Sequence, residues 1–62
     1  MKRRDLMKRI ISYARRTDQD LRITEGANHT KVKLGERQAV VARHSEISDL
    51  TAKGIFKQLG ME

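Results

Sequence analysis

Apolar residues recur along the chain with two different spacings, and each spacing predicts a different kind of element. Over residues 4–15 they recur three and four positions apart, which is typical of a helix with one buried face. Residues 21–25 and 29–34 alternate between apolar and polar side chains, which predicts two short strands, and a third strand is predicted over 37–43. The helical spacing returns near the end of the chain, where the apolar stripe comprises Ala52, Ile55, Phe56 and Leu59.

Local signals mark both ends of this second helix. Ser48 or Asp49 can cap its beginning, because a short polar side chain accepts a hydrogen bond from the first free backbone N–H groups. Gly60 followed by Met61 is typical of a left-handed C-cap with a hydrophobic contact. We therefore expect the helix to lie between these two signals.

Gly35 and Glu36 fit a two-residue hairpin turn that begins with glycine, and a turn of this length sets the strand register. The pairs expected from it are Leu34–Arg37, Val32–Ala39, Thr30–Val41 and His29–Ala42. One face of the sheet would then be apolar, through Val32, Ala39 and Val41. The opposite face would carry His29, Lys31, Lys33, Gln38, Val40 and His44, with His44 placed diagonally to His29.

The turn before His29 is the other connection with a clear signal. It spans residues 25–28, and Gly26 and Asn28 are residues that tolerate positive φ. The complete order is then a helix, three antiparallel strands and a helix. This is an α+β fold in one domain of residues 1–62, in which two helices cover one sheet face and leave the other open.

Composition excludes several classes of protein. The chain contains no cysteine, which excludes disulfides and thiolate zinc sites, and its histidines and carboxylates show no metal-ligand spacing. No apolar run approaches the roughly 20 residues that span a membrane. We therefore expect no metal, no membrane partner and a cytoplasmic location.

Positive charge is concentrated at the beginning of the chain. The formal net charge is +6, and residues 1–16 contain seven Lys or Arg but one acidic residue. Residues 17–62 contain seven of each kind. Such a concentrated surplus indicates a polyanion or an acidic protein as partner, and a solvated helix face accounts for it equally well.

His29 is the candidate for proton-transfer chemistry. Lys31 and Lys33 share its predicted face and can bind phosphate oxygens, while histidine exchanges protons near neutral pH. The simpler interpretation is a half-exposed strand histidine whose ring caps the preceding turn. Tyr13 and Phe56 are the only aromatic residues, which argues against a surface that stacks RNA bases. No glycine-rich phosphate loop and no paired nucleophile is visible.

Several short segments form a larger pattern around this histidine. They are Gly26-Ala27-Asn28-His29, the hairpin that follows it, Ala42-Arg43-His44, Glu46-Ile47 and Ile55-Phe56-Lys57-Gln58-Leu59-Gly60. In order and spacing, this pattern resembles the HicA family, the mRNA interferase toxins of type II toxin–antitoxin systems. Three features depart from the family: Ala27 replaces a frequent serine, Ala42 replaces a frequent proline, and the first helix lacks its usual terminal glycine.

The resemblance implies an α-β-β-β-α fold similar to the double-stranded-RNA-binding domain, and an endoribonuclease that needs no cofactor. It implies His29 as the catalytic acid/base, an mRNA substrate and a HicB-type antitoxin that covers the active site. The residues expected to bind substrate are Gly26, Asn28, Lys31, Lys33, Arg43 and His44, with His44 also the candidate for a second proton-transfer group.

Two other functions fit the same residues. One is a non-catalytic RNA-binding module of the same fold, which would need the lysines but not His29. The other is a basic interaction subunit, such as a ribosome-associated protein, that binds through its first helix. The sequence does not specify a cleavage preference, a dependence on ribosomes or the stoichiometry with an antitoxin.

Overall fold

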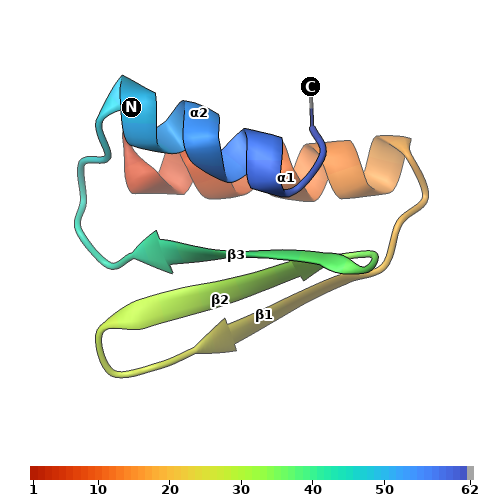
Figure 1. The fold of residues 1–62 in the computed structure, drawn as a ribbon, viewed down its shortest axis with the longest axis horizontal. Helices are drawn as coiled ribbons and strands as arrows, with labels where there is room; N and C mark the ends of the chain where they lie inside the picture. The colour runs from red at the N-terminus through yellow and green to blue at the C-terminus, as the bar shows by residue number, and fades with distance from the viewer. Residues whose placement is uncertain (62) are drawn as a thin grey trace.

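The computed structural model describes residues 1–61 and contains two helices on one side of a three-stranded sheet (Figure 1). The elements are α1 Arg3–Arg16, β1 Leu21–Glu25, β2 His29–Leu34, β3 Arg37–Ala42 and α2 Asp49–Gln58. The predicted α-β-β-β-α order is therefore confirmed. The observed α1 is one residue longer at each end than predicted, and β3 ends one residue earlier, at Ala42.

The three strands form an open antiparallel sheet in the order β1-β2-β3. The register of β2 and β3 is the predicted one, with the pairs Leu34–Arg37, Val32–Ala39, Thr30–Val41 and His29–Ala42. Gly35 has a φ of 62°, whereas Glu36 is not among the residues with positive φ. This is the glycine-first turn that the sequence predicts, and it sets which side chains face the helices.

One face of the sheet packs against both helices. The buried apolar side chains are Leu6, Ile10, Ala14, Val32, Leu34, Ala39, Val41, Ile47, Ala52, Ile55 and Leu59. Phe56 belongs to the predicted stripe of α2 but is only partly buried, because its ring lies toward the groove between the helices with Arg9 over it. The fully buried apolar side chains are therefore all aliphatic, and Phe56, the largest apolar side chain, lies at the edge of the core.

The end of α1 explains how this helix stops without a glycine. Asp18 adopts a left-handed φ of 54°, the conformation that glycine usually supplies after a helix. The backbone N–H of Gln19 then donates to the carbonyl of Ala14 at 2.9 Å, and that of Asp18 to Arg15 at 3.3 Å. Asp18 thus takes the place of the terminal glycine whose absence the sequence shows.

Both predicted ends of α2 are present. The hydroxyl of Ser48 accepts a hydrogen bond from the backbone N–H of Thr51 at 3.2 Å, so Ser48 rather than Asp49 caps the helix. Gly60 has a φ of 72°, and the N–H of Met61 donates to the carbonyl of Phe56 at 2.9 Å. These are the bonds of the expected left-handed C-cap.

The first residues of the chain pair with the segment between β3 and α2. The N–H of Arg3 donates to the carbonyl of Ser45 at 2.9 Å, and the N–H of Ile47 donates to the carbonyl of Met1 at 2.8 Å. This pairing holds the beginning of α1 at the end of the sheet where the β1–β2 turn lies. No periodicity in the sequence indicates it.

Candidate active site

The turn between β1 and β2 places His29 at the first position of β2. The N–H of Gly26 donates to the carbonyl of His29 at 2.8 Å, which leaves Ala27 and Asn28 at the tip. The predicted reason for glycine and asparagine here was wrong, since neither Gly26 nor Asn28 has a positive φ. Gly26 is instead favoured by a close approach, because a Cβ atom at this position would lie 3.0 Å from the carbonyl oxygen of His29, a tighter contact than most Cβ atoms make.

His29 is exposed on the face of the sheet that the helices do not cover. It lines a shallow hollow of about 470 Å³, together with Thr24, Gly26, Ala27, Asn28, Lys31 and Val40. A hollow of this volume lies within the usual range of small-molecule sites, roughly 300–1,000 Å³. The turn, the first half of β2 and the exposed Val40 of β3 therefore form one concave surface around the imidazole.

Cations continue from His29 along this outer face. Lys31 lies two residues further along β2, which places its Cα roughly 6.8 Å from that of His29, and Lys33 follows at the same spacing. Arg22 pairs with Lys33 across the β1–β2 ladder, so it lies on this face as well. None of the strand residues on the outer face carries a carboxylate; they are Arg22, Thr24, His29, Lys31, Lys33, Gln38, Val40 and Ala42.

On the inner side, a polar network fixes the same turn to α1 and to the end of β3. The fully buried Thr30 hydroxyl accepts a hydrogen bond from the guanidinium of Arg3 and donates to the Glu25 carboxylate at 2.8 Å. Arg43 lies 3.7 Å from that carboxylate and donates to the carbonyl of Gly26 at 2.7 Å. Each of these contacts restrains the backbone next to His29.

The structure brings together some of the predicted site residues but not all of them. Gly26, Asn28, His29 and Lys31 line the hollow, and Lys33 extends the same face. Arg43 contacts Glu25 and the turn carbonyl, so its guanidinium joins the inner network. His44 is exposed beyond the end of β3 and does not line the hollow, because the strand on which its diagonal placement depended ends at Ala42.

Two residues beyond those predicted from the sequence belong to this region. Arg22 adds a third cation to the outer face, and its position follows from the pairing of Leu21 with Leu34 in the same ladder. Arg3 ties α1 to Thr30. The register of β1 against β2 could have revealed Arg22, whereas the Arg3 contact depends on how the helix lies over the sheet.

This arrangement places one imidazole beside a row of cations on the outer face of the sheet. Among residues 1–61, His29 supplies the one imidazole that lines the hollow, and an imidazole is the commonest general acid or base in proteins. Within residues 1–61, no three His, Asp or Glu side chains gather in a way that could hold a metal ion. The same residues include no helix that is both long and apolar enough to cross a membrane.

Comparisons of the chain with protein-family models, with characterised proteins and with solved structures find no significant match. The resemblance to the HicA family therefore rests on the motifs of the sequence. The geometry of the site is an independent basis for a functional proposal.

Proposed function

We propose that this protein is an endoribonuclease in which His29 is the catalytic acid/base, and that it is the toxin of a toxin–antitoxin pair. The observation that carries the proposal is the exposed imidazole of His29 in a hollow on a cationic sheet face without strand carboxylates. Such a face attracts a phosphate chain, and the turn presents the imidazole to it. The motifs shared with HicA toxins support the same assignment.

The proposed reaction uses the 2′-hydroxyl of RNA as the nucleophile. His29 in its neutral form accepts the hydroxyl proton as the 2′-oxygen attacks the adjacent phosphorus. The bond from phosphorus to the 5′-oxygen breaks, which leaves a 2′,3′-cyclic phosphate, and the departing 5′-oxygen takes a proton from water. Alternatively, His29 as imidazolium protonates the leaving oxygen and water accepts the first proton. Lys31 and Lys33 bind the phosphates and offset the negative charge that develops.

A site with one histidine limits how far acid–base catalysis can accelerate RNA cleavage. General acid–base catalysis by one positioned side chain contributes about 10²–10⁴-fold. Because no second imidazole and no carboxylate among residues 1–61 lines the hollow, we expect a slow enzyme. Slow cleavage is compatible with toxicity, since a single cut inactivates a message.

The partner we propose is an acidic antitoxin of the HicB type that covers His29. The beginning of α1 lies at the same end of the molecule, because Arg3 bonds to Thr30, the residue after His29 in β2. An antitoxin that covers the site and extends around this end of the molecule would therefore also meet the exposed cations Lys2 and Arg4. The positive charge at this end of the molecule supports an acidic partner.

The test is cleavage of a purified RNA by the His29→Ala variant. We expect the rate to fall by about 10²–10⁴-fold, while the free energy of unfolding changes by no more than about 0.5 kcal/mol, because the side chain is exposed. His44→Ala, measured in parallel, removes an imidazole outside the hollow and should lower the rate by less than about tenfold.

Binding distinguishes the two functional classes in the same experiment. His29→Ala should bind the RNA with an affinity close to that of the unaltered protein, because the lysines are retained. Cleavage by His29→Ala at the original rate would show that the assignment is wrong. If neither protein cleaves RNA and both bind it, the domain is a non-catalytic RNA-binding module.

A further inference from the structure

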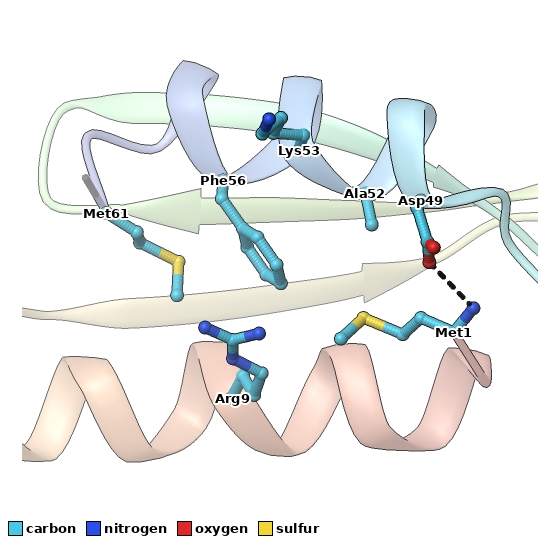
Figure 2. Close-up of a pocket in the computed structure, with 7 residues that line it drawn as sticks. All are labelled: Met1, Arg9, Asp49, Ala52, Lys53, Phe56 and Met61. Atoms are coloured by element: carbon cyan, nitrogen blue, oxygen red, sulfur yellow. Dashed lines mark hydrogen bonds and ion pairs between the residues drawn. The ribbon is translucent and has the colours of Figure 1, made fainter.

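A groove runs between α1 and α2 on the side of the helices that faces away from the sheet (Figure 2). Figure 2 looks into this groove, with the strands behind the two helices. Its volume is about 440 Å³, and its lining residues are Met1, Arg9, Asp49, Ala52, Lys53, Phe56 and Met61. The hollow around His29 opens on the opposite side of the molecule, so the two sites are separate.

The floor of the groove is apolar. Phe56 and Met61, which are only partly buried, point into it from α2 and the residues after it, and Met1 points into it from the other side (Figure 2). A second hollow continues the groove toward the end of α1, and Arg9 and Met61 line both. Apolar surface that a small domain leaves open between two helices is available to the apolar face of a third helix.

The sides of the groove carry positive charge. Arg9 and Lys53 line the first hollow and Arg16 lines the second. Within residues 1–61, none of these three cations lies within 4 Å of a carboxylate. Among the lining residues within 1–61, Asp49 carries the one carboxylate, and it lies 3.4 Å from the backbone nitrogen of Met1. The charge that would complement this groove is therefore negative.

The aromatic rings of the groove distinguish a protein from a nucleic acid. The guanidinium of Arg9 lies over the ring of Phe56, 4.8 Å from its centre, and that of Arg16 lies over Tyr13 at 5.4 Å. Nucleic-acid bases bind aromatic residues by stacking on ring faces of this kind. Because a guanidinium already occupies one face of each ring, less aromatic surface is left for stacking bases, while Met1 and Met61 add aliphatic surface to the groove.

We propose that this groove docks an acidic amphipathic helix of another protein. The apolar side of that helix would lie on Phe56 and Met61, and its carboxylates would meet Arg9, Arg16 and Lys53. The ten residues of α2 extend about 15 Å, which matches a partner helix of three turns. This surface goes beyond the proposed RNA cleavage and does not depend on it, since an occupied groove leaves the His29 face open.

The experiment uses a synthetic peptide as the probe. It has 14 residues, with leucine at the i, i+3, i+4 and i+7 positions and glutamate or alanine elsewhere, and a scrambled peptide of the same composition is its control. Titration into the isotope-labelled protein should shift the amide resonances of Ala52, Lys53, Phe56 and Met61. The scrambled peptide should bind at least tenfold more weakly, because it cannot place leucines on one side and carboxylates on the other.

Charge reversal at matched positions tests the contribution of the cations. Arg9→Glu combined with Lys53→Glu should weaken peptide binding by at least tenfold. Arg22→Glu combined with Lys33→Glu changes the net charge equally on the opposite face, and should change peptide binding by less than twofold. If the first pair of substitutions does not yield a folded protein, Arg9→Gln with Lys53→Gln removes the same charges more mildly.

Three outcomes would overturn the proposal. The first is equal binding of the ordered and scrambled peptides, which would mean attraction by net charge alone. The second is a set of shifted resonances around His29 and Lys31 rather than in the groove. The third is that the Arg9 and Lys53 substitutions weaken the binding of a single-stranded RNA but not the binding of the peptide. The groove would then be a nucleic-acid site. None of these results depends on an RNA cleavage assay. The proposal for the groove can therefore be rejected or supported independently of the endoribonuclease proposal.

Discussion

The two faces of the sheet are built from the same strands, and they differ in what constrains their side chains. In β2, Thr30, Val32 and Leu34 are fully buried on the inner face, while His29, Lys31 and Lys33 are exposed on the outer face. The inner residues must fill the space below the helices, so their size and polarity are limited by packing. The outer residues contact solvent, so their positive charge has no structural requirement and is available for function.

The inner face is itself uneven. Its residues in β2 are buried, as are Ala39 and Val41 of β3. Arg37 at the start of β3 is exposed, and Ile23 of the edge strand β1 is 40% exposed although it pairs with the buried Val32. Thr30 is the buried polar residue of this face, and Arg3 and Glu25 satisfy its hydroxyl. Packing therefore dominates the centre of the inner face, and hydrogen bonding dominates the end that adjoins the candidate site.

The largest difference between the faces should appear in two neighbouring valines of β3. Val41 is fully buried and Val40 is 51% exposed. Val41→Ala should lower the free energy of unfolding by about 2–3 kcal/mol, the transfer cost of two methylene-sized groups plus the cavity they leave. Val40→Ala should lower it by less than about 0.5 kcal/mol.

Urea unfolding followed by circular dichroism measures both variants. Because a domain of this length has a total stability of about 3–9 kcal/mol, the Val41→Ala midpoint should shift by a large fraction of its value. Equal midpoints for the two variants would mean that the register of β3 is not the observed one.

A smaller effect is expected at the polar end of the inner face. Glu25→Ala removes the acceptor of the buried Thr30 hydroxyl and should cost about 1–2 kcal/mol of stability. Its contacts with Arg3 at 3.9 Å and Arg43 at 3.7 Å add little, because the carboxylate is half exposed. Glu36→Ala in the exposed β2–β3 turn is the matched control and should change stability by less than about 0.5 kcal/mol.

Thermal melts of the two glutamate variants at equal ionic strength give the comparison. A Glu25→Ala protein as stable as Glu36→Ala would show that the network does not hold the turn.

The parts of the fold that depend on neighbouring residues could be predicted from the sequence. The alternating pattern and the Gly35–Glu36 turn were sufficient to predict every residue pair between β2 and β3. A turn of two residues allows only one register of the strands that it joins. The left-handed Gly60 and the cap at Ser48 follow from the same kind of local rule. These predictions needed no knowledge of how the helices lie over the sheet.

The parts that depend on distant contacts could not be predicted in this way. Nothing local shows that Asp18 adopts a left-handed conformation, or that Gly26 is small because the His29 carbonyl lies against it. Arg3 reaches Thr30 across 27 positions of sequence, and Phe56 lies at an open groove instead of in the sealed core. For the candidate site, the alternating pattern of β2 was enough to predict that His29, Lys31 and Lys33 share one face. The contacts of Arg43 could not be predicted, because they depend on where β3 ends.

The smallest effect we predict lies on the outer face, at Lys33. Lys33→Ala should leave the free energy of unfolding within about 0.5 kcal/mol of its original value, because the side chain is exposed. If Lys33 binds one phosphate of a single-stranded RNA, its loss should reduce the slope of log K against log salt by about 0.7. The same relation gives about a fourfold weaker affinity at 0.15 M salt.

The measurement is a fluorescence titration of a labelled RNA at several salt concentrations, with Lys57→Ala as the control. Lys57 is an exposed lysine of α2, on the helix layer, so its removal changes the net charge equally without touching the outer face. Equal slopes for the two variants would mean that RNA responds only to the total charge of the protein. A reduced slope for Lys33→Ala alone would locate the phosphate chain on the same face as His29, which the proposed cleavage requires.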